Sequence, residues 1–241
     1  MGIIRMGPPW PLIIKLQQQF NLTHFIETGT YYGDTAIEAA LRFSNIITIE
    51  NSKILYEKVS EKYCEVKNVD FLFGDSRTVL KEIIPTLDKT TIFWLDGHWC
   101  GSDTFGEQDQ CPVIDEIRII NNSDNAHFLF IDDARLFMSP PPIPNEIEQW
   151  PSITEVINTI IDSMHNYYIV IFEDVIIAVP ESAKEFVAKY CQEINTQQWK
   201  VYNKIQNVPK IHQGIKQINQ GLRIVIHDLG SKLKRMCSYQ K

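Results

Sequence analysis

The chain has 241 residues, of which 44% are hydrophobic and 22% are charged, and its formal net charge is −7. This apolar content is ordinary for a globular protein with a real core, and the length suits one large domain, alone or with an appendage. No uninterrupted apolar stretch reaches the ~18 residues of a membrane span, so we expect none.

The negative charge is unevenly distributed along the chain. Residues 201–241 hold eight Lys and Arg against one acid, Asp228, which leaves 15 basic and 29 acidic residues in 1–200. An acidic body argues against a nucleic-acid-binding groove. We therefore expect one domain over 1–200 and a basic C-terminal extension over 201–241. The extension would be a solvated helical tail, or it would touch an acidic partner or another subunit of a homo-oligomer.

The five cysteines are scattered and form no C-x-x-C pair. Neither a disulfide framework nor a zinc site is therefore indicated. We expect free thiols in a reducing, cytoplasmic compartment.

Strands and helices alternate along most of the chain. Apolar residues at helical spacing predict a first helix over 10–20. Five strands follow, each with a helix after it: strands 24–26, 46–49, 69–73, 91–95 and 128–131, and helices 35–43, 52–62, 77–84, 113–120 and 152–163. The runs 167–172 and 175–179 form a hairpin pattern, and a last helix is expected over 181–198. This order predicts an α/β fold with a doubly wound, mostly parallel, seven-stranded sheet that ends in an antiparallel hairpin.

Two of these strands end abruptly in carboxylates. The fourth runs into Asp96-Gly97-His98-Trp99, and Asp132-Asp133 follows the fifth. Ligands of open α/β sheets bind just outside the carboxyl ends of the strands. Asp96, Asp132 and Asp133 are hard oxygen donors for a divalent cation, and the imidazole of His98 suits proton transfer. Simpler interpretations are a helix N-cap plus a solvated acid for the pair, and a structural or stacking role for His98.

Three earlier strand ends predict an adenosine site. The first strand runs into Glu27-Thr28-Gly29-Thr30-Tyr31-Tyr32-Gly33, a glycine-bearing turn before a helix, where a backbone can approach a ligand closely. Glu50 ends the second strand and can accept both hydroxyls of a ribose. Gly74-Asp75-Ser76 follows the third and can reach an adenine edge. Glu50 alone would be a surface acid, but the three motifs together favour adenosine.

With these motifs the chain resembles class I S-adenosylmethionine-dependent methyltransferases over roughly residues 24–180. Within that class it is similar to metal-dependent O-methyltransferases of the catechol and macrocin types. The resemblance implies a Rossmann-like fold with a cofactor half over about 24–96 and an acceptor half over about 97–180. It implies Mg²⁺ bound by Asp96, Asp132 and Asp133, and His98 with Asp96 as the catalytic residues. The implied S-adenosylmethionine ligands are Glu27, Thr28, Gly29, Thr30, Tyr32, Gly33, Glu50, Asp75, Ser76 and Asp96.

The resulting hypothesis is methyl transfer from S-adenosylmethionine to a hydroxyl of a sugar, a glycan or another polar small molecule or natural product, with Mg²⁺ binding the acceptor. Two alternatives stay open. One is a metal-independent methyltransferase acting on a peptide or amine, with Asp96 and His98 as base and orienter. The other is a non-catalytic adenosine-binding module.

Several segments depart from the family pattern or bear on the acceptor. Arg135 could neutralise Asp132 or Asp133, which would favour a structural cluster without metal. The acid-rich loop 100–109 offers Asp103, Glu107 and Asp109 as substrate contacts or replacement ligands. The proline-rich loop 140–144 and the tail are expected to build the acceptor pocket. A stacking wall is expected from some of Trp94, Trp99, Phe105, Phe137 and Trp150.

Overall fold

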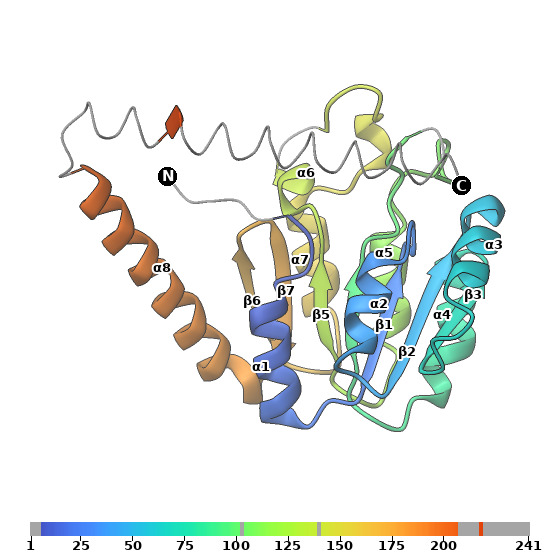
Figure 1. The fold of residues 1–241 in the computed structure, drawn as a ribbon, viewed down its shortest axis with the longest axis horizontal. Helices are drawn as coiled ribbons and strands as arrows, with labels where there is room; N and C mark the ends of the chain where they lie inside the picture. The colour runs from blue at the N-terminus through green and yellow to red at the C-terminus, as the bar shows by residue number, and fades with distance from the viewer. Residues whose placement is uncertain (1–5, 102–103, 139–140, 207–216, 219–241) are drawn as a thin grey trace. The chain divides into compact units, whose positions relative to one another are not determined.

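The computed structural model describes residues 6–101, 104–138, 141–206 and 217–218. In this part of the chain seven strands form one sheet in the order β3-β2-β1-β4-β5-β7-β6 (Figure 1). The strands are β1 (His24–Thr28), β2 (Asn45–Glu50), β3 (Val69–Phe73), β4 (Ile92–Leu95), β5 (Phe128–Ile131), β6 (Tyr167–Phe172) and β7 (Val175–Pro180). The first five pair in parallel, and β7 is antiparallel to both β5 and β6. The predicted sheet, with its closing hairpin, is confirmed.

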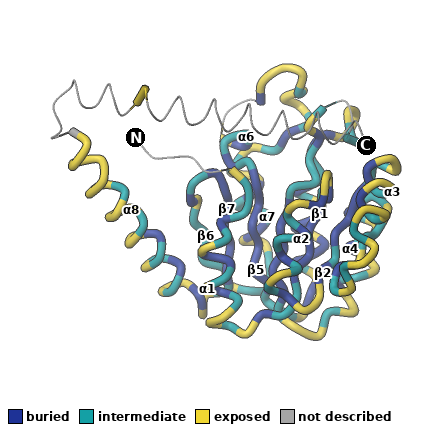
Figure 2. The backbone as a smooth tube through the Cα atoms, in the orientation of Figure 1, coloured by how far each residue is buried: buried dark blue, intermediate teal, exposed yellow. Residues whose placement is uncertain are grey.

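Helices cover both faces of the sheet (Figures 1 and 2). One face carries α1 (Trp10–Phe20), α2 (Asp34–Ala40) and α3 (Lys53–Lys62). The other carries α4 (Ser76–Ile83), α5 (Val113–Ile120), the short α6 (Ala134–Met138) and α7 (Ile153–Ile161), whose apolar side chains share one core with the sheet. Every residue of β4 and β5 is buried, as expected of central strands covered on both sides.

Some helix boundaries differ from the sequence-based expectation. The helix α2 ends at Ala40 rather than Phe43, because Phe43 turns into the core and packs on Phe25 with ring centroids 5.3 Å apart. The helix α4 ends at Ile83, one residue before the expected end, and Pro85 follows in a 3-10 turn, Ile84–Thr86, at a position where no backbone N–H is needed. The last helix, α8 (Lys184–Gln206), follows a 3-10 turn and is longer than expected.

Two compact units divide the chain, Met1–Tyr190 and Cys191–Lys241. In the second unit, α8 exposes apolar side chains at Trp199, Val201, Tyr202 and Ile205. Most of the basic extension lies outside the described residues, so the boundary at residue 200 stays a prediction. No helix in the described part of the chain combines the length and apolarity needed to cross a lipid bilayer.

The turn after β1 lies against the end of β4. Gly29 has φ +85°, and a Cβ built on it would lie 2.1 Å from the carbonyl oxygen of Asp96. The backbone N–H of Asp96 donates to the Thr28 carbonyl at 3.1 Å, so the two strand ends stay in contact. Only glycine fits here, because any side chain would both clash with backbone and require a left-handed conformation.

We expect Gly29→Ala to lower the free energy of unfolding by about 3 kcal/mol, measured by equilibrium urea denaturation, because the methyl group must push the two strand ends apart. Gly7→Ala is the matched control: its φ is +79°, but a Cβ there meets nothing within 4 Å. The control should lose only about 1 kcal/mol, the cost of the left-handed backbone. Equal losses in the two variants would contradict the steric explanation.

One carboxyl group is buried in the core below the end of β4. Glu116 of α5 is 1% exposed. A Cβ built on Gly97 would lie 3.2 Å from its Oε1. Burial raises the pKa of Glu116 to about 7 from 4.5, although interactions with Ser76 and Thr28 oppose the shift. The folded state therefore favours the protonated carboxyl, whereas the unfolded chain ionises at lower pH.

This shift predicts a pH-dependent effect of Glu116→Gln. Between about pH 4.5 and pH 7 the unfolded state releases a proton that the folded state keeps, so folding stability falls as the pH rises. The amide removes this term. Relative to wild type, the variant should therefore gain about 1–3 kcal/mol on going from pH 5 to pH 8, measured by urea denaturation. Glu57→Gln, at an exposed position of α3, should show no such gain. A pH-independent difference between Glu116→Gln and wild type would contradict the assignment.

Candidate functional site

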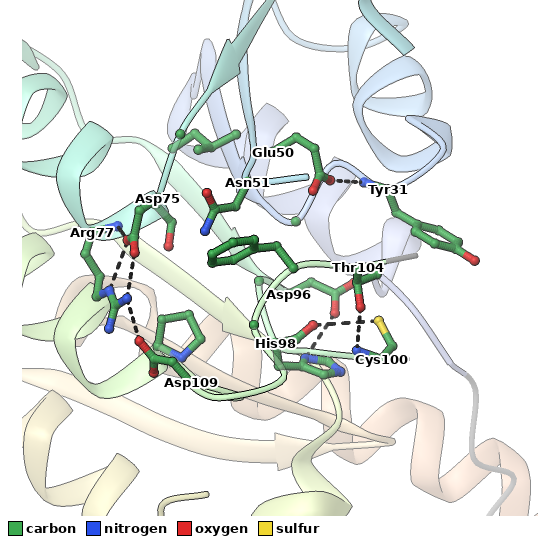
Figure 3. A pocket seen from close by; sticks show the side chains of 18 residues that line it. Tyr31, Glu50, Asn51, Asp75, Arg77, Asp96, His98, Cys100, Thr104 and Asp109 are labelled. Carbon is green, nitrogen blue, oxygen red and sulfur yellow. Dashed lines mark hydrogen bonds and ion pairs between the residues drawn. The ribbon is translucent and has the colours of Figure 1, made fainter. Parts of the chain in front are cut away.

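A pocket lies at the carboxyl ends of β1 to β4, where the connecting loops begin (Figure 3). Its floor and walls come from the turn after β1, the ends of β2 and β3, and the long loop between β4 and α5. The polar and ionisable lining residues are Tyr31, Glu50, Asn51, Asp75, Ser76, Arg77, Asp96, His98, Cys100, Thr104 and Asp109. The predicted strand ends therefore do meet at one edge of the sheet.

The glycine-bearing turn contributes mainly backbone. Gly29 and Tyr31 line the pocket. Glu27 is buried below the turn, where its Oε2 accepts a 2.5 Å hydrogen bond from Thr48, and Thr48 Oγ1 lies 2.6 Å from Thr30 Oγ1. Burial raises the pKa of Glu27 well above its ordinary value. Its carboxyl thus supports the turn from below. Direct cofactor contacts by Glu27, Thr28, Thr30, Tyr32 and Gly33 stay predictions.

Glu50 stands in the pocket wall at the end of β2. Its Oε2 accepts a hydrogen bond from the backbone N–H of Tyr31 at 2.8 Å, and its Oε1 accepts one from Ser52 at 2.8 Å. Ser52 occupies the N-cap position of α3 but makes no side-chain capping bond. Burial raises the pKa of Glu50, and these backbone bonds oppose the shift. Each oxygen keeps a further lone pair, so the fixed carboxylate can accept hydroxyl donors.

The end of β3 carries an ion-paired acid. Asp75 caps α4 by accepting the backbone N–H of Arg77 at 2.9 Å, and its Oδ2 lies 2.6 Å from Arg77 Nη2. The same guanidinium nitrogen lies 2.6 Å from Oδ2 of Asp109, in the loop before α5 (Figure 3). The hydrogen bonds from Arg77 lower the pKa of Asp75 despite its partial burial. Asp75 and Ser76 line the pocket, and their contact with an adenine stays a prediction.

His98 lies between two carboxylates. Its Nε2 is 3.1 Å from Oδ2 of Asp133, and its Nδ1 is 3.4 Å from Oδ1 of Asp96. The ring packs edge-on against Trp150, with centroids 5.3 Å apart. Oδ1 of the neighbouring Asp132 accepts the backbone N–H of Asp133 at 2.8 Å. The structure thus brings His98, Asp96 and Asp133 together, as the strand ends suggested.

Burial and neighbouring charges raise the pKa of three side chains in this cluster and lower that of the fourth. Burial raises the pKa of Asp96 to about 7 and that of Asp132 to about 6. Burial alone would lower the pKa of His98, but the hydrogen bond to Asp133 and the nearby carboxylates raise it above its ordinary value. Burial would raise the pKa of Asp133, but His98 and Arg135 lower it. Asp133 is therefore the ionised anchor of the group.

The three acids do not present an open set of metal ligands. Oδ1 of Asp133 is 2.8 Å from Arg135 Nη2, while its Oδ2 faces His98. Among the described residues no group of three or more His, Cys, Asp or Glu is arranged to hold a metal ion. This arrangement does not fit Mg²⁺ as it stands, because both oxygens of one intended ligand already face cationic or N–H groups. The magnesium site stays a prediction.

Most of the aromatic residues considered for a stacking wall belong to the core. Trp94, Trp99, Phe137 and Trp150 are at most 8% exposed. Phe105 is 60% exposed and lines the pocket. Of the acids in its loop, Asp109 pairs with Arg77, and Asp103 lies outside the described residues. Phe105 is therefore the one member of the proposed wall that both lines the pocket and is exposed.

Sequence reasoning missed three residues that shape the site. Arg77 could have been suspected, because a basic residue follows Asp75 by two positions. Gln110 carries no such signal: its buried side chain accepts hydrogen bonds from the backbone N–H of Glu146 at 2.9 Å and from Trp150 Nε1 at 3.0 Å. It thereby ties the segment after the proline-rich loop to the pocket loop. Asp174 of the β6–β7 turn pairs with Arg135, and its sequence context indicates nothing beyond the hairpin turn.

Comparison with known proteins supports the fold. No family model and no curated protein matches the chain. Among solved structures, a protein from Staphylococcus aureus provisionally assigned as a caffeoyl-CoA O-methyltransferase superposes with a TM-score of 0.51 at 13% identity, covering 73% of this chain and 86% of that one. Fibrillarin from Aeropyrum pernix, solved with S-adenosyl-L-methionine, gives a TM-score of 0.42 at 15% identity, with 66% of each chain covered.

A further match is a protein from Klebsiella pneumoniae provisionally assigned as an O-methyltransferase. Its TM-score is 0.48 at 11% identity, with 73% of this chain and 81% of that chain covered. At such identities the likeness concerns the fold alone. The strand order, the reversed β7 and the match to the Staphylococcus aureus structure show that the chain has the Rossmann-like fold of class I S-adenosylmethionine-dependent methyltransferases.

Proposed function

We propose that the protein is an S-adenosylmethionine-dependent methyltransferase that methylates a hydroxyl of a polar small molecule, with His98 as the general base. The observation that carries the proposal is that Glu50, at the end of β2, and His98, after β4, line the same pocket. One pocket thus holds both a carboxylate suited to the ribose of the cofactor and a base suited to the hydroxyl of the acceptor. The shared fold supports the choice of cofactor.

Two features of the pocket support S-adenosylmethionine as the cofactor, the turn after β1 and the Glu50 carboxylate. The backbone of Gly29 lies against Asp96, which keeps the turn after β1 low and side-chain-free beside the pocket. Glu50 is held by two backbone N–H groups and keeps acceptor capacity for ribose hydroxyls. When bound, S-adenosylmethionine would supply a methyl group on a positively charged sulfur, a charge that the acidic pocket favours.

The chain's own part in the reaction is to hold the acceptor and remove its proton. If Asp133 keeps the Nε2–H of a neutral His98, the lone pair of the ring is on Nδ1, beside Asp96. The acceptor hydroxyl would give its proton to Nδ1 while its oxygen forms the new bond to the methyl carbon and the carbon–sulfur bond breaks. In such an in-line displacement, positioning contributes much of the rate.

Activation of the acceptor hydroxyl by Mg²⁺ is an alternative to proton removal by His98. Binding by Asp96, Asp132 and Asp133 would require Asp133 to release His98 or Arg135. The other alternative is an amine or peptide acceptor, for which Asp96 and His98 would act as base and orienter without a metal ion. The acceptor class is therefore tested with sugars, other polar hydroxyl compounds, amines and peptides in one assay, with and without a chelator.

We expect Glu50→Gln to weaken S-adenosylmethionine binding by about 10- to 100-fold, measured by isothermal calorimetry, because a neutral amide accepts hydroxyl hydrogen bonds less strongly than a carboxylate. The amide oxygen can still accept one of the two backbone bonds, which protects the turn. Glu57→Gln, on the exposed surface of α3, should bind as wild type does. Unchanged affinity in Glu50→Gln would contradict the assignment of Glu50 as the ribose-binding carboxylate.

We expect His98→Asn to lower kcat by about 100- to 10,000-fold while the affinity for S-adenosylmethionine stays within about three-fold, because only the proton acceptor is lost. Radiolabelled methyl transfer to the acceptor panel gives kcat, and calorimetry gives affinity. His165→Asn is the control: this histidine contacts the Ser123 carbonyl and does not line the pocket.

The same assay in EDTA separates the metal hypotheses. We expect wild-type activity to survive chelation, since Asp133 already has partners from the chain. Loss of activity in EDTA that returns with Mg²⁺ would favour the metal-dependent reaction instead. No methyl transfer to any acceptor, together with tight cofactor binding, would favour a non-catalytic adenosine-binding module.

A further inference from the structure

A buried acid in the closing hairpin anchors an arginine next to the site. Asp174 lies in the turn between β6 and β7 and is 2% exposed. Its Oδ2 forms an ion pair with Arg135 Nη1, and its Oδ1 accepts the backbone N–H of Arg135 at 3.0 Å. The Asp174 carbonyl also accepts the backbone N–H of Ala134 at 2.8 Å. The start of α6 is therefore fixed to the hairpin by both backbone and side-chain bonds.

The other arm of the same guanidinium reaches the pocket cluster. Arg135 Nη2 is 2.8 Å from Oδ1 of Asp133, whose Oδ2 is 3.1 Å from His98 Nε2. Asp133 has φ +54°, a left-handed conformation that is uncommon for a residue other than glycine. Its side chain thus leaves the end of β5 in a direction set by a strained backbone and by two charged neighbours. A continuous chain of polar contacts runs from Asp174 through Arg135 and Asp133 to His98.

We propose that Arg135, anchored by Asp174, is a positioning residue that holds Asp133 and through it sets the orientation of the His98 ring. This inference rests on the proposed function. A guanidinium is suited to the task because its planar fork offers separate nitrogens to two carboxylates, whereas a lysine ammonium is a single point charge. Arg135 also places a positive charge beside Asp133 and, after the hydrogen bond and charge of His98, helps to lower the pKa of that carboxyl.

The ion pair with Asp174 fixes the position of the Arg135 guanidinium. Asp174 is almost completely buried, and a buried carboxylate without a partner is strongly unfavourable. Pairing with Asp174 therefore holds one end of the guanidinium firmly and leaves the other end for Asp133. An exposed arginine without this anchor would lose the orientation through side-chain motion.

The test compares Arg135→Met with Arg118→Met. Arg118 also pairs with an aspartate, but on the exposed side of α5 and away from the pocket lining. Two readouts are taken at one pH: the ¹⁵N and ¹H shifts of the His98 ring in histidine-labelled protein, assigned with His98→Asn, and the kinetics of methyl transfer. In Arg135→Met we expect the His98 Nε2 signal to shift and kcat to fall about 10- to 100-fold, with affinity for S-adenosylmethionine within about three-fold. Arg118→Met should match wild type in all three.

Two further variants cover the case in which Arg135→Met folds poorly. Arg135→Lys keeps the charge but cannot serve both carboxylates, so its His98 signal and kcat should lie between those of wild type and Arg135→Met. Asp174→Asn keeps the shape of the anchor, and should shift the His98 signal in the same direction by a smaller amount. Thermal melts show which variants are folded at the assay temperature.

The outcomes separate this proposal from the proposed function. If the His98 signal moves but the wild-type protein transfers no methyl group, Arg135 remains the positioning residue and the proposed methyltransferase function is rejected. An unmoved signal in the folded variants would overturn the positioning role, whatever happens to kcat. Equal losses of kcat and cofactor affinity would also overturn it, because they would indicate general damage to the pocket.

Discussion

The site depends on the parallel pairing of β1 with both of its neighbours. Thr28 lies opposite Ile49 of β2 and Leu95 of β4, so the residues that follow each strand emerge at one level. Gly29, Glu50 and Asp96 therefore come together because the strands that lead to them are aligned. The contact of Gly29 with the Asp96 carbonyl fixes how closely the strand ends approach. The pocket lies at these strand ends and is enclosed by the loops that follow them.

The same alignment gathers acidic groups at the edge of the sheet, and the structure offsets their repulsion in different ways. Glu50 is held by backbone N–H groups, and Glu27 accepts a hydroxyl hydrogen bond below the turn. Asp75 and Asp109 share Arg77, and Asp133 shares Arg135 with Asp174. One arginine thus lies in the wall at the end of β3, and the other contacts Asp133, the acid that faces His98.

His98 links these electrostatics to the chemistry. An imidazole between Asp96 and Asp133 has an obvious partner on each nitrogen, so its orientation is defined before a ligand arrives. Asp96 and Asp132 have raised pKa values because they are buried among other acids, whereas Asp133 is kept ionised by its cationic neighbours. The acids that looked equivalent in the sequence therefore have different roles, and the difference comes from what each one touches.

The amino-acid sequence is enough to predict the succession of strands and helices along the chain, the closing hairpin and the strand ends that carry polar residues. These features follow from local patterns: apolar periodicity, β-branched runs, and polar residues where a buried strand ends. Three side-chain contacts appear only in the folded chain: Asp133 with His98, Asp109 with Arg77, and Glu27 with Thr48. The physical reason is that a side chain's partner depends on segments distant in sequence. Asp174, which holds Arg135, is 39 residues away from it and belongs to a hairpin whose own sequence signals only a turn.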